Sequence, residues 1–301
     1  MNFSDYVLEK VFYIEDKLAR LVQEFPRENK QDSFPFLSCD TYFFLCNTRV
    51  NSAANIRDIQ RLNKESKLYI NGNILRESWR EISQILDKAK LQPDLIIIGD
   101  SDDPPSQDVL RTLNQHCARI YCVNLVNEIG QEVVSIPLGL ESQRYRSAGQ
   151  LRDFKQEAKF EIRNRRFGVL VAWNDSTDYI GRIRAREILR PLTITTEVKK
   201  RITARSIHRL MRRSLFVACP RGNGLDTHRF WEALYLGALP ITLKKDEIPA
   251  FNYGPHLTLE NWQEMSKFSH KDLISIYENR ASELQSFRQD SLSQLKTIFN
   301  A

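Results

Sequence analysis

Residues 214–243 decide the fold, and they read SLFVACPRGNGLDTHRFWEALYLGALPITL. Residues 215–219 form a short apolar run that ends at Pro220, which predicts a buried strand. Residues 239–243 are a second apolar run of the same kind. The segment between them has the composition of a helix, and Gly237 is placed to end that helix. The stretch therefore predicts a βαβ unit.

A glycine-rich loop at residues 221–226 joins the first of these strands to the helix. Gly222 and Gly224 let the backbone approach a ligand closely, and Asp226 or Thr227 can cap the helix. The N-terminus of a helix presents N–H groups and a positive dipole end, which together favour a phosphate. Other polar candidates stand at the same place, namely Arg221, Asn223, His228 and Arg229.

The same stretch resembles the nucleotide-sugar site of exostosin-type glycosyltransferases. The shared pattern is Cys-Pro-Arg-Gly, a short polar stretch, Arg-x-x-Glu-Ala-Leu, and then Gly-Ala-x-Pro-Ile. A sparser similarity upstream links the chain to bacterial members of that group and to ribitol-phosphate xylosyltransferases. The matching positions are Cys219 to Gly222, Arg229, Glu232 to Leu234, Gly237, Ala238, Pro240 and Ile241, and upstream Asp100 to Asp102, Asn124 and Ile136 to Glu141.

Exostosin-type enzymes have the GT-B fold, so the resemblance implies two Rossmann-like domains whose parallel sheets face a central cleft. It also implies a C-terminal helix that crosses back to the first domain. We expect an acceptor-side domain at residues 1–150, a nucleotide-sugar-binding domain at 151–270, and the crossing helix at 271–301. Independently of the resemblance, the alternation of apolar strands and helical segments predicts a parallel α/β protein.

The alternation covers most of the chain, with residues 142–165 as an interdomain connection that includes a helix. Expected strands are 42–46, 67–70, 95–99, 119–125, 133–137, 167–173 and 252–259, and expected helices are 4–25, 53–63, 75–89, 106–116, 181–192, 202–213 and 271–299.

Composition limits the class of protein. The chain has 301 residues, of which 42% are hydrophobic, enough for one large domain or two smaller ones. The net charge of +6 suits anionic partners such as nucleotide phosphates, and it is too small to indicate nucleic acid. Five cysteines without a Cys-x-x-Cys pair suggest free thiols in a reducing compartment. We expect a cytoplasmic protein without a signal peptide, with peripheral attachment to a membrane left open.

The helix after the glycine-rich loop carries the two strongest donor-site candidates. Arg229, in its first turn, can bind two phosphate oxygens at once. Its alternative role is an ion pair with Glu232 one turn later. The resemblance implies that Glu232 contacts the donor, often through ribose hydroxyls. The sequence leaves both interpretations open.

Further donor candidates flank this helix or precede it in the chain. His228 can hydrogen-bond a phosphate or sugar, or pack as a capping residue, and Asp226 can hold the sugar or cap the helix. Arg182, Arg184 and Arg186 belong to a helix that follows the expected strand at 167–173. One or two of them can reach the diphosphate, whereas a solvated basic face is the alternative.

Asp100, Asp102 and Asp103 follow the buried strand at residues 95–99. A carboxylate there would face the cleft from the first domain, so we assign Asp102 as the catalytic base, with Asp100 as the second candidate. The alternatives are a metal-binding Asp-x-Asp and a simple turn before Pro104. Because the phosphate-binding residues lie in the second domain, we expect no metal and no cofactor beyond a nucleotide diphosphate sugar, with UDP favoured.

Taken together, the sequence predicts an inverting glycosyltransferase that acts on a hydroxyl of a glycan, polysaccharide or lipid-linked acceptor. A catalytically silent nucleotide-sugar-binding or scaffold subunit of a transferase complex is one alternative, and a membrane or transferase partner is left open. A second alternative is a protein that binds RNA or a membrane surface through Arg163, Arg165, Arg166, Arg182, Arg184 and Arg186.

Overall fold

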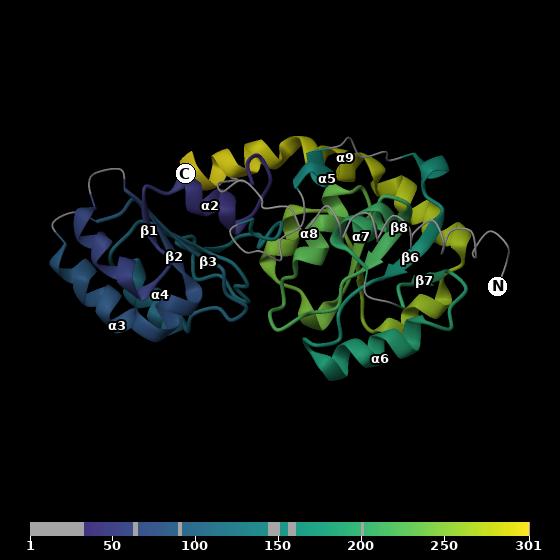
Figure 1. Cartoon of the computed structure of the whole chain (residues 1–301), viewed down its shortest axis with the longest axis horizontal. Coiled ribbons are helices and arrows are strands. Elements are labelled where there is room, and N and C mark those ends of the chain that lie inside the picture. The colour runs from purple at the N-terminus through teal and green to yellow at the C-terminus, as the bar shows by residue number, and fades with distance from the viewer. Residues whose placement is uncertain are drawn as a thin grey trace.

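The structure, a computed structural model, describes residues 33–62, 66–89, 92–143, 151–155, 161–199 and 202–300. Two five-stranded sheets build two lobes that lie side by side (Figure 1). Every strand pair in both sheets is parallel. The predicted α/β architecture of two Rossmann-like halves is therefore confirmed. The helix predicted at residues 4–25 lies outside the described residues.

The first sheet has its strands in chain order, β1-β2-β3-β4-β5. Because each strand adds on the same side, right-handed crossovers place the connecting helices on one face. Alternate side chains of β3 point to opposite faces of the sheet. Ile96 and Ile98 pack toward these helices, whereas Leu95 and Ile97 belong to the larger core shared with the second lobe. The elements are β1 (Thr48–Val50), η1 (Ala53–Arg61), β2 (Lys67–Asn71), α3 (Gly72–Lys88), β3 (Leu95–Gly99), α4 (Gln107–Asn114), β4 (Arg119–Cys122) and β5 (Val133–Ser135).

The strand predicted at residues 42–46 is wrong, because this segment belongs to the helix α2 (Cys39–Leu45). Ser38 starts the helix: its side chain accepts a hydrogen bond from the Asp40 N–H, and its carbonyl accepts one from the Tyr42 N–H. The aromatic residues favour a strand by propensity, but the cap and the burial of the first turn against the sheet override it. The helix predicted at residues 53–63 forms as the 3₁₀ helix η1.

The second sheet has the order β10-β9-β8-β6-β7. The chain adds β7 on one side of β6 and β8 on the other, so the strand order reverses between β6 and β8. Open α/β sheets bind ligands beyond the carboxyl ends of the strands at such a switch point. The elements are β6 (Phe167–Val171), α6 (Tyr179–Leu189), β7 (Thr195–Glu197), α7 (Ala204–Met211), β8 (Ser214–Ala218), α8 (His228–Tyr235), β9 (Leu239–Leu243) and β10 (Leu257–Leu259).

The predicted βαβ unit is confirmed, since β8 and β9 are parallel neighbours joined by α8. Gly237 ends this helix region with φ of 80°, a left-handed conformation that glycine adopts without strain. Shorter elements complete the lobe and its connection to the first: α5 (Leu151–Lys155), η2 (Ile162–Asn164), η3 (Lys244–Asp246), η4 (Pro249–Tyr253) and η5 (Trp262–Lys267).

The C-terminal helix α9 (His270–Asn300) runs along both lobes, as its yellow ribbon shows in Figure 1. Near its start, Tyr277 is buried in the second lobe and donates a 2.8 Å hydrogen bond to the Gly237 carbonyl. Near its end, the Phe299 carbonyl accepts a 2.8 Å hydrogen bond from Lys67 of β2, and the Phe299 ring lies 6.5 Å from that of Tyr42. The predicted crossing back to the first domain is therefore confirmed.

Candidate functional site

Arg182 connects the two loops at the switch point of the second sheet. It projects from the first turn of α6, donates a 2.9 Å hydrogen bond to the Arg221 carbonyl, and donates one of 2.6 Å to the Asn174 carbonyl. Burial lowers the pKa of Arg182, and the nearby charge of Arg229 lowers it further. Two guanidinium groups therefore lie close together beyond β6 and β8, where an anion would relieve their repulsion.

Arg229 is paired with Glu232 in the first turns of α8. Its Nη1 donates to Glu232 Oε2 at 2.8 Å, so the ion pair that the sequence left open is present. Burial by itself would raise the pKa of Glu232, but the charge of Arg229 and the His208 ring 3.5 Å away hold this pKa at about 2. Glu232 is thus an anion at neutral pH. The Arg229 side chain keeps 24% of its surface exposed, so it can still meet a ligand.

The glycine-rich loop packs tightly against the first lobe. A Cβ atom added at Gly224 would lie 2.8 Å from the Asp102 carbonyl oxygen and 2.7 Å from Asn124 Oδ1. The Gly222 N–H donates to the Gly224 carbonyl, and the Asp226 N–H donates to Asn124 Oδ1. We expected the N–H groups of this loop to bind a phosphate. These two instead donate hydrogen bonds to oxygen atoms of the protein.

Asp226 and His228 both bind the first lobe. The Asp226 carboxylate accepts hydrogen bonds from the Leu138 N–H at 2.8 Å and from the Trp231 indole at 2.7 Å. His228 Nδ1 lies 2.8 Å from the Gly139 carbonyl oxygen. Burial raises the pKa of Asp226 to about 7. These contacts give two predicted donor ligands an interlobe role, and the residue at the N-cap of α8 is Thr227.

The three aspartates after β3 have different partners. Asp100 accepts hydrogen bonds from Tyr69 at 2.6 Å and from Ser142 at 3.4 Å. Asp103 pairs with Arg76 of the first lobe. Asp102 is exposed, and its Oδ2 accepts a 3.3 Å hydrogen bond from Asn223 Nδ2 of the glycine-rich loop. Of the three carboxylates, that of Asp102 contacts the second lobe.

The arginines of α6 also separate by role. Arg186 pairs with Asp175 and Glu197 and stacks over Trp173 at 5.2 Å, so it stabilises the lobe. Arg184 is exposed. Arg182 is the member of the set whose contacts reach the glycine-rich loop.

The basic surface that an RNA-binding interpretation would need is also incomplete. Arg165, one of its members, is 6% exposed and donates to the carbonyls of Met211, Ser214 and Leu236. Together with the paired Arg186, it is a structural residue rather than part of a free basic face.

A cavity of about 470 Å³ opens at the carboxyl ends of β6 and β7. Small-ligand pockets commonly enclose roughly 300–1,000 Å³. The strand β7, and with it Glu197, was not predicted from the sequence, although the β-branched Thr195 and Thr196 favour a strand. The lining residues are Asp175, Arg186, Arg190, Glu197, Val198 and Lys199.

Three further properties concern the described part of the chain alone. No group of three or more His, Cys, Asp or Glu side chains is arranged there to hold a metal ion. None of the helices in that part has the length and apolarity needed to cross a membrane. All five cysteines are free thiols.

No family model matches the chain, and a search of the curated proteins found no match. Among solved structures, the chain is similar to a UDP-forming α,α-trehalose-phosphate synthase from Burkholderia xenovorans. The TM-score is 0.47 and the sequence identity is 12%, over 82% of this chain and 75% of that one.

Gly224 and Gly222 offer a matched pair of substitutions. Gly224→Ala should lower the free energy of unfolding by about 1–3 kcal/mol, since its methyl group would meet a backbone carbonyl and a hydrogen-bonded amide. Gly222→Ala should cost less, because the nearest atom is the end of the Arg182 side chain at 3.2 Å. Urea denaturation measures both. Equal losses for the two variants would contradict the interlobe packing of this loop.

Proposed function

We propose that the chain is a glycosyltransferase of the GT-B type that uses a nucleotide diphosphate sugar. The observation that supports this most is the pair Arg182 and Arg229 at the switch point of the second sheet, with the exposed Asp102 of the first lobe touching the same loop. A cationic site on one lobe and a carboxylate on the other are what transfer from a charged leaving group requires.

In the proposed reaction, an acceptor hydroxyl attacks the anomeric carbon of the donor sugar. The bond between this carbon and the phosphate oxygen breaks, and the nucleoside diphosphate leaves with the electron pair. Arg182 and Arg229 stabilise the charge that develops on the diphosphate. Asp102 accepts the proton of the hydroxyl from the opposite side, and the configuration at the anomeric carbon inverts.

The remaining donor candidates have supporting roles in this proposal. Glu232 is ionised and holds Arg229, so a ribose hydroxyl would share a carboxylate that is already fixed in place. Arg221 folds back on its own loop by donating to the Asn223 carbonyl at 2.8 Å. The cavity at Glu197 lies beside the switch point and offers space for a nucleoside.

We favour UDP as the nucleotide and a glycan, polysaccharide or lipid-linked hydroxyl as the acceptor, on the resemblance of residues 219–241 to exostosin-type enzymes. A thermal-shift screen against UDP, GDP, CMP and their sugars tests the nucleotide. A ligand present at 100 times its dissociation constant should add about 2.7 kcal/mol of stability.

Arg229→Ala should weaken UDP binding by about 1.5–3 kcal/mol, the range for a hydrogen bond to a charged group. Uridine binding should fall much less, because uridine lacks the diphosphate. Calorimetry with both ligands measures the difference, and Arg111→Ala on the exposed face of α4 is the control. Equal losses for UDP and uridine would make Arg229 a purely structural residue.

Asp102→Asn should lower turnover by roughly 10²–10⁴-fold, because the amide keeps the shape but loses the basic oxygen. Donor affinity should stay nearly unchanged. Asp103→Asn, which removes the pairing with Arg76 of the first lobe, is the matched control. Near-normal turnover of the Asp102 variant would remove it from the base role, and Asp100 would be tested next.

Metal independence follows from placing the diphosphate on arginines of the second lobe. Turnover should persist in EDTA at the rate measured without it. Loss of turnover in EDTA that Mn²⁺ restores would instead favour a metal site at Asp100 and Asp102.

A further inference from the structure

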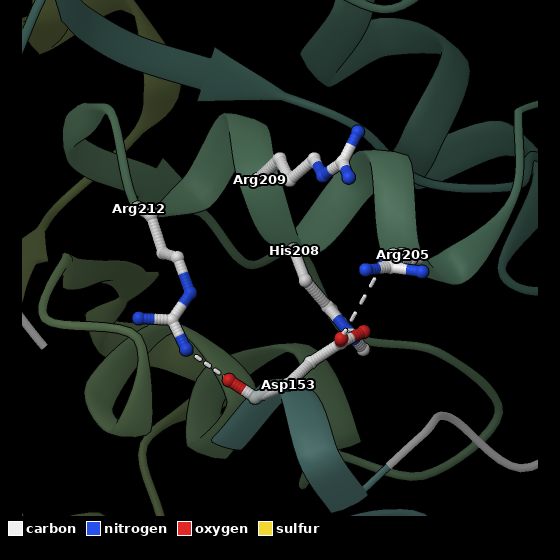
Figure 2. A pocket seen from close by; sticks show the side chains of 5 residues that line it. All are labelled: Asp153, Arg205, His208, Arg209 and Arg212. Atoms are coloured by element: carbon white, nitrogen blue, oxygen red, sulfur yellow. Dashed lines mark hydrogen bonds and ion pairs between the residues drawn. The ribbon is translucent and has the colours of Figure 1, made fainter. Parts of the chain in front are cut away.

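His208 lies between two carboxylates that come from different helices. Its Nδ1 is 3.0 Å from Asp153 Oδ2 on α5, and its Nε2 is 3.5 Å from Glu232 Oε1 on α8. The side chain is 1% exposed. Figure 2 shows His208 descending from α7 toward Asp153. Glu232 uses its other oxygen for Arg229, so a chain of charges runs from α5 to the donor site.

The chemistry of imidazole links this arrangement to a protonation state. Neutral imidazole has one N–H donor, whereas imidazolium has two. Both carboxylates can therefore receive a hydrogen bond from His208 when the ring is protonated. Burial by itself would lower the pKa of His208, but Asp153 and Glu232 outweigh burial and raise it.

Other charged groups also face His208 and Asp153. Arg205, Arg209 and Arg212 line a cavity of about 100 Å³ together with the two residues (Figure 2). Arg205 Nε lies 4.0 Å from Asp153 Oδ1, and Arg212 donates to the Asp153 carbonyl. These cations oppose protonation of His208. The two carboxylates in direct contact favour it, because Coulomb energy falls with distance.

We propose that His208 is a positioning residue for the donor site: when its ring is protonated, it holds Glu232 and weakens the hold of that carboxylate on Arg229. This inference rests on the proposed function, since it assigns Arg229 to the donor diphosphate. Glu232 and the diphosphate compete for the Arg229 guanidinium. A protonated His208 neutralises part of the Glu232 charge, so the diphosphate can compete for Arg229.

The pH dependence follows from the direction of the His208 pKa. The ordinary histidine pKa is about 6.5, and the folded-state value is raised. The pairing of His208 with both carboxylates is therefore complete at a pH below the ordinary histidine pKa. It is lost as the pH rises through the raised pKa of His208. Above it, one of the two carboxylates loses its donor, and Glu232 holds Arg229 more strongly. UDP affinity should fall over this window.

The first test measures UDP affinity by calorimetry across this pH range. At low pH, His208→Gln should weaken UDP binding about tenfold, within the usual 5–150-fold range of coupling between sites. Wild type and variant should converge above the raised pKa. Each comparison uses the same UDP at the same pH, so titration of the ligand's phosphate cancels. His208→Lys, which keeps a positive charge at high pH, should restore affinity and flatten the profile.

His116→Gln is the matched control. His116 Nε2 lies 3.5 Å from Asp87 in the first lobe, and its side chain is 8% exposed, so the variant removes a comparable pair far along the chain from Arg229. It should leave the UDP profile unchanged. The inference is overturned if His208→Gln binds UDP with the wild-type affinity and pH profile.

A second test needs no nucleotide and keeps failure of the inference separate from failure of the proposed function. The chain has five histidines, so NMR titration with single His→Gln variants assigns each ring. The Arg229 Nε–H resonance, assigned by its loss in Arg229→Lys, should shift with the His208 titration. If the Arg229 resonance does not shift as His208 titrates, the inference is overturned. This outcome is informative even if no nucleotide binds or the His208→Gln variant does not fold. Absence of UDP binding in wild type, with a coupled Arg229 signal, would refute the donor role alone.

Discussion

The hydrogen bonds of the buried Asp226 carboxylate hold the two lobes in their relation to each other. One oxygen accepts the Leu138 N–H of the first lobe and the other accepts the Trp231 indole of the second. A buried carboxylate without donors would cost several kcal/mol, so both lobes must stay in register around it. Asp226 lies two residues before the first residue of α8. Its hydrogen bond with Leu138 therefore also fixes the position of the glycine-rich loop and of Arg229.

This constraint divides the polar residues of residues 219–241 between two tasks. Asp226 and His228 use their side chains to bind the first lobe, and Gly224 permits the close approach to Asp102 and Asn124. Arg182 and Arg229 keep their charge for the switch point. A motif that looks like one ligand-binding unit in the sequence therefore forms part of the interface between the lobes, and its proposed binding role rests on Arg229.

Most strands and helices and the two-lobe arrangement were predictable, whereas the individual long-range side-chain contacts were not. The bounds of β9 and β3 were predicted because short apolar runs between Gly, Pro and Asp residues identify buried strands. The strand prediction for residues 42–46 was wrong because the aromatic residues favour a strand, whereas packing against a sheet distant in sequence stabilises a helix there. The role of Asp226 was not visible because its partner Leu138 is 88 residues away, and His208 reaches Asp153 across 55 residues.

The electrostatics of the second lobe give these separate observations one physical cause. Burial lowers the pKa of Arg182, and the nearby charge of Arg229 lowers it further, so the site carries repulsion between like charges. Glu232 compensates Arg229 from the interior, and His208 in turn compensates Glu232. Glu232 is thereby shared between Arg229 and His208. Such a chain stabilises the two guanidinium groups and still leaves positive potential beyond β6 and β8, whereas a single strong ion pair would cancel that potential.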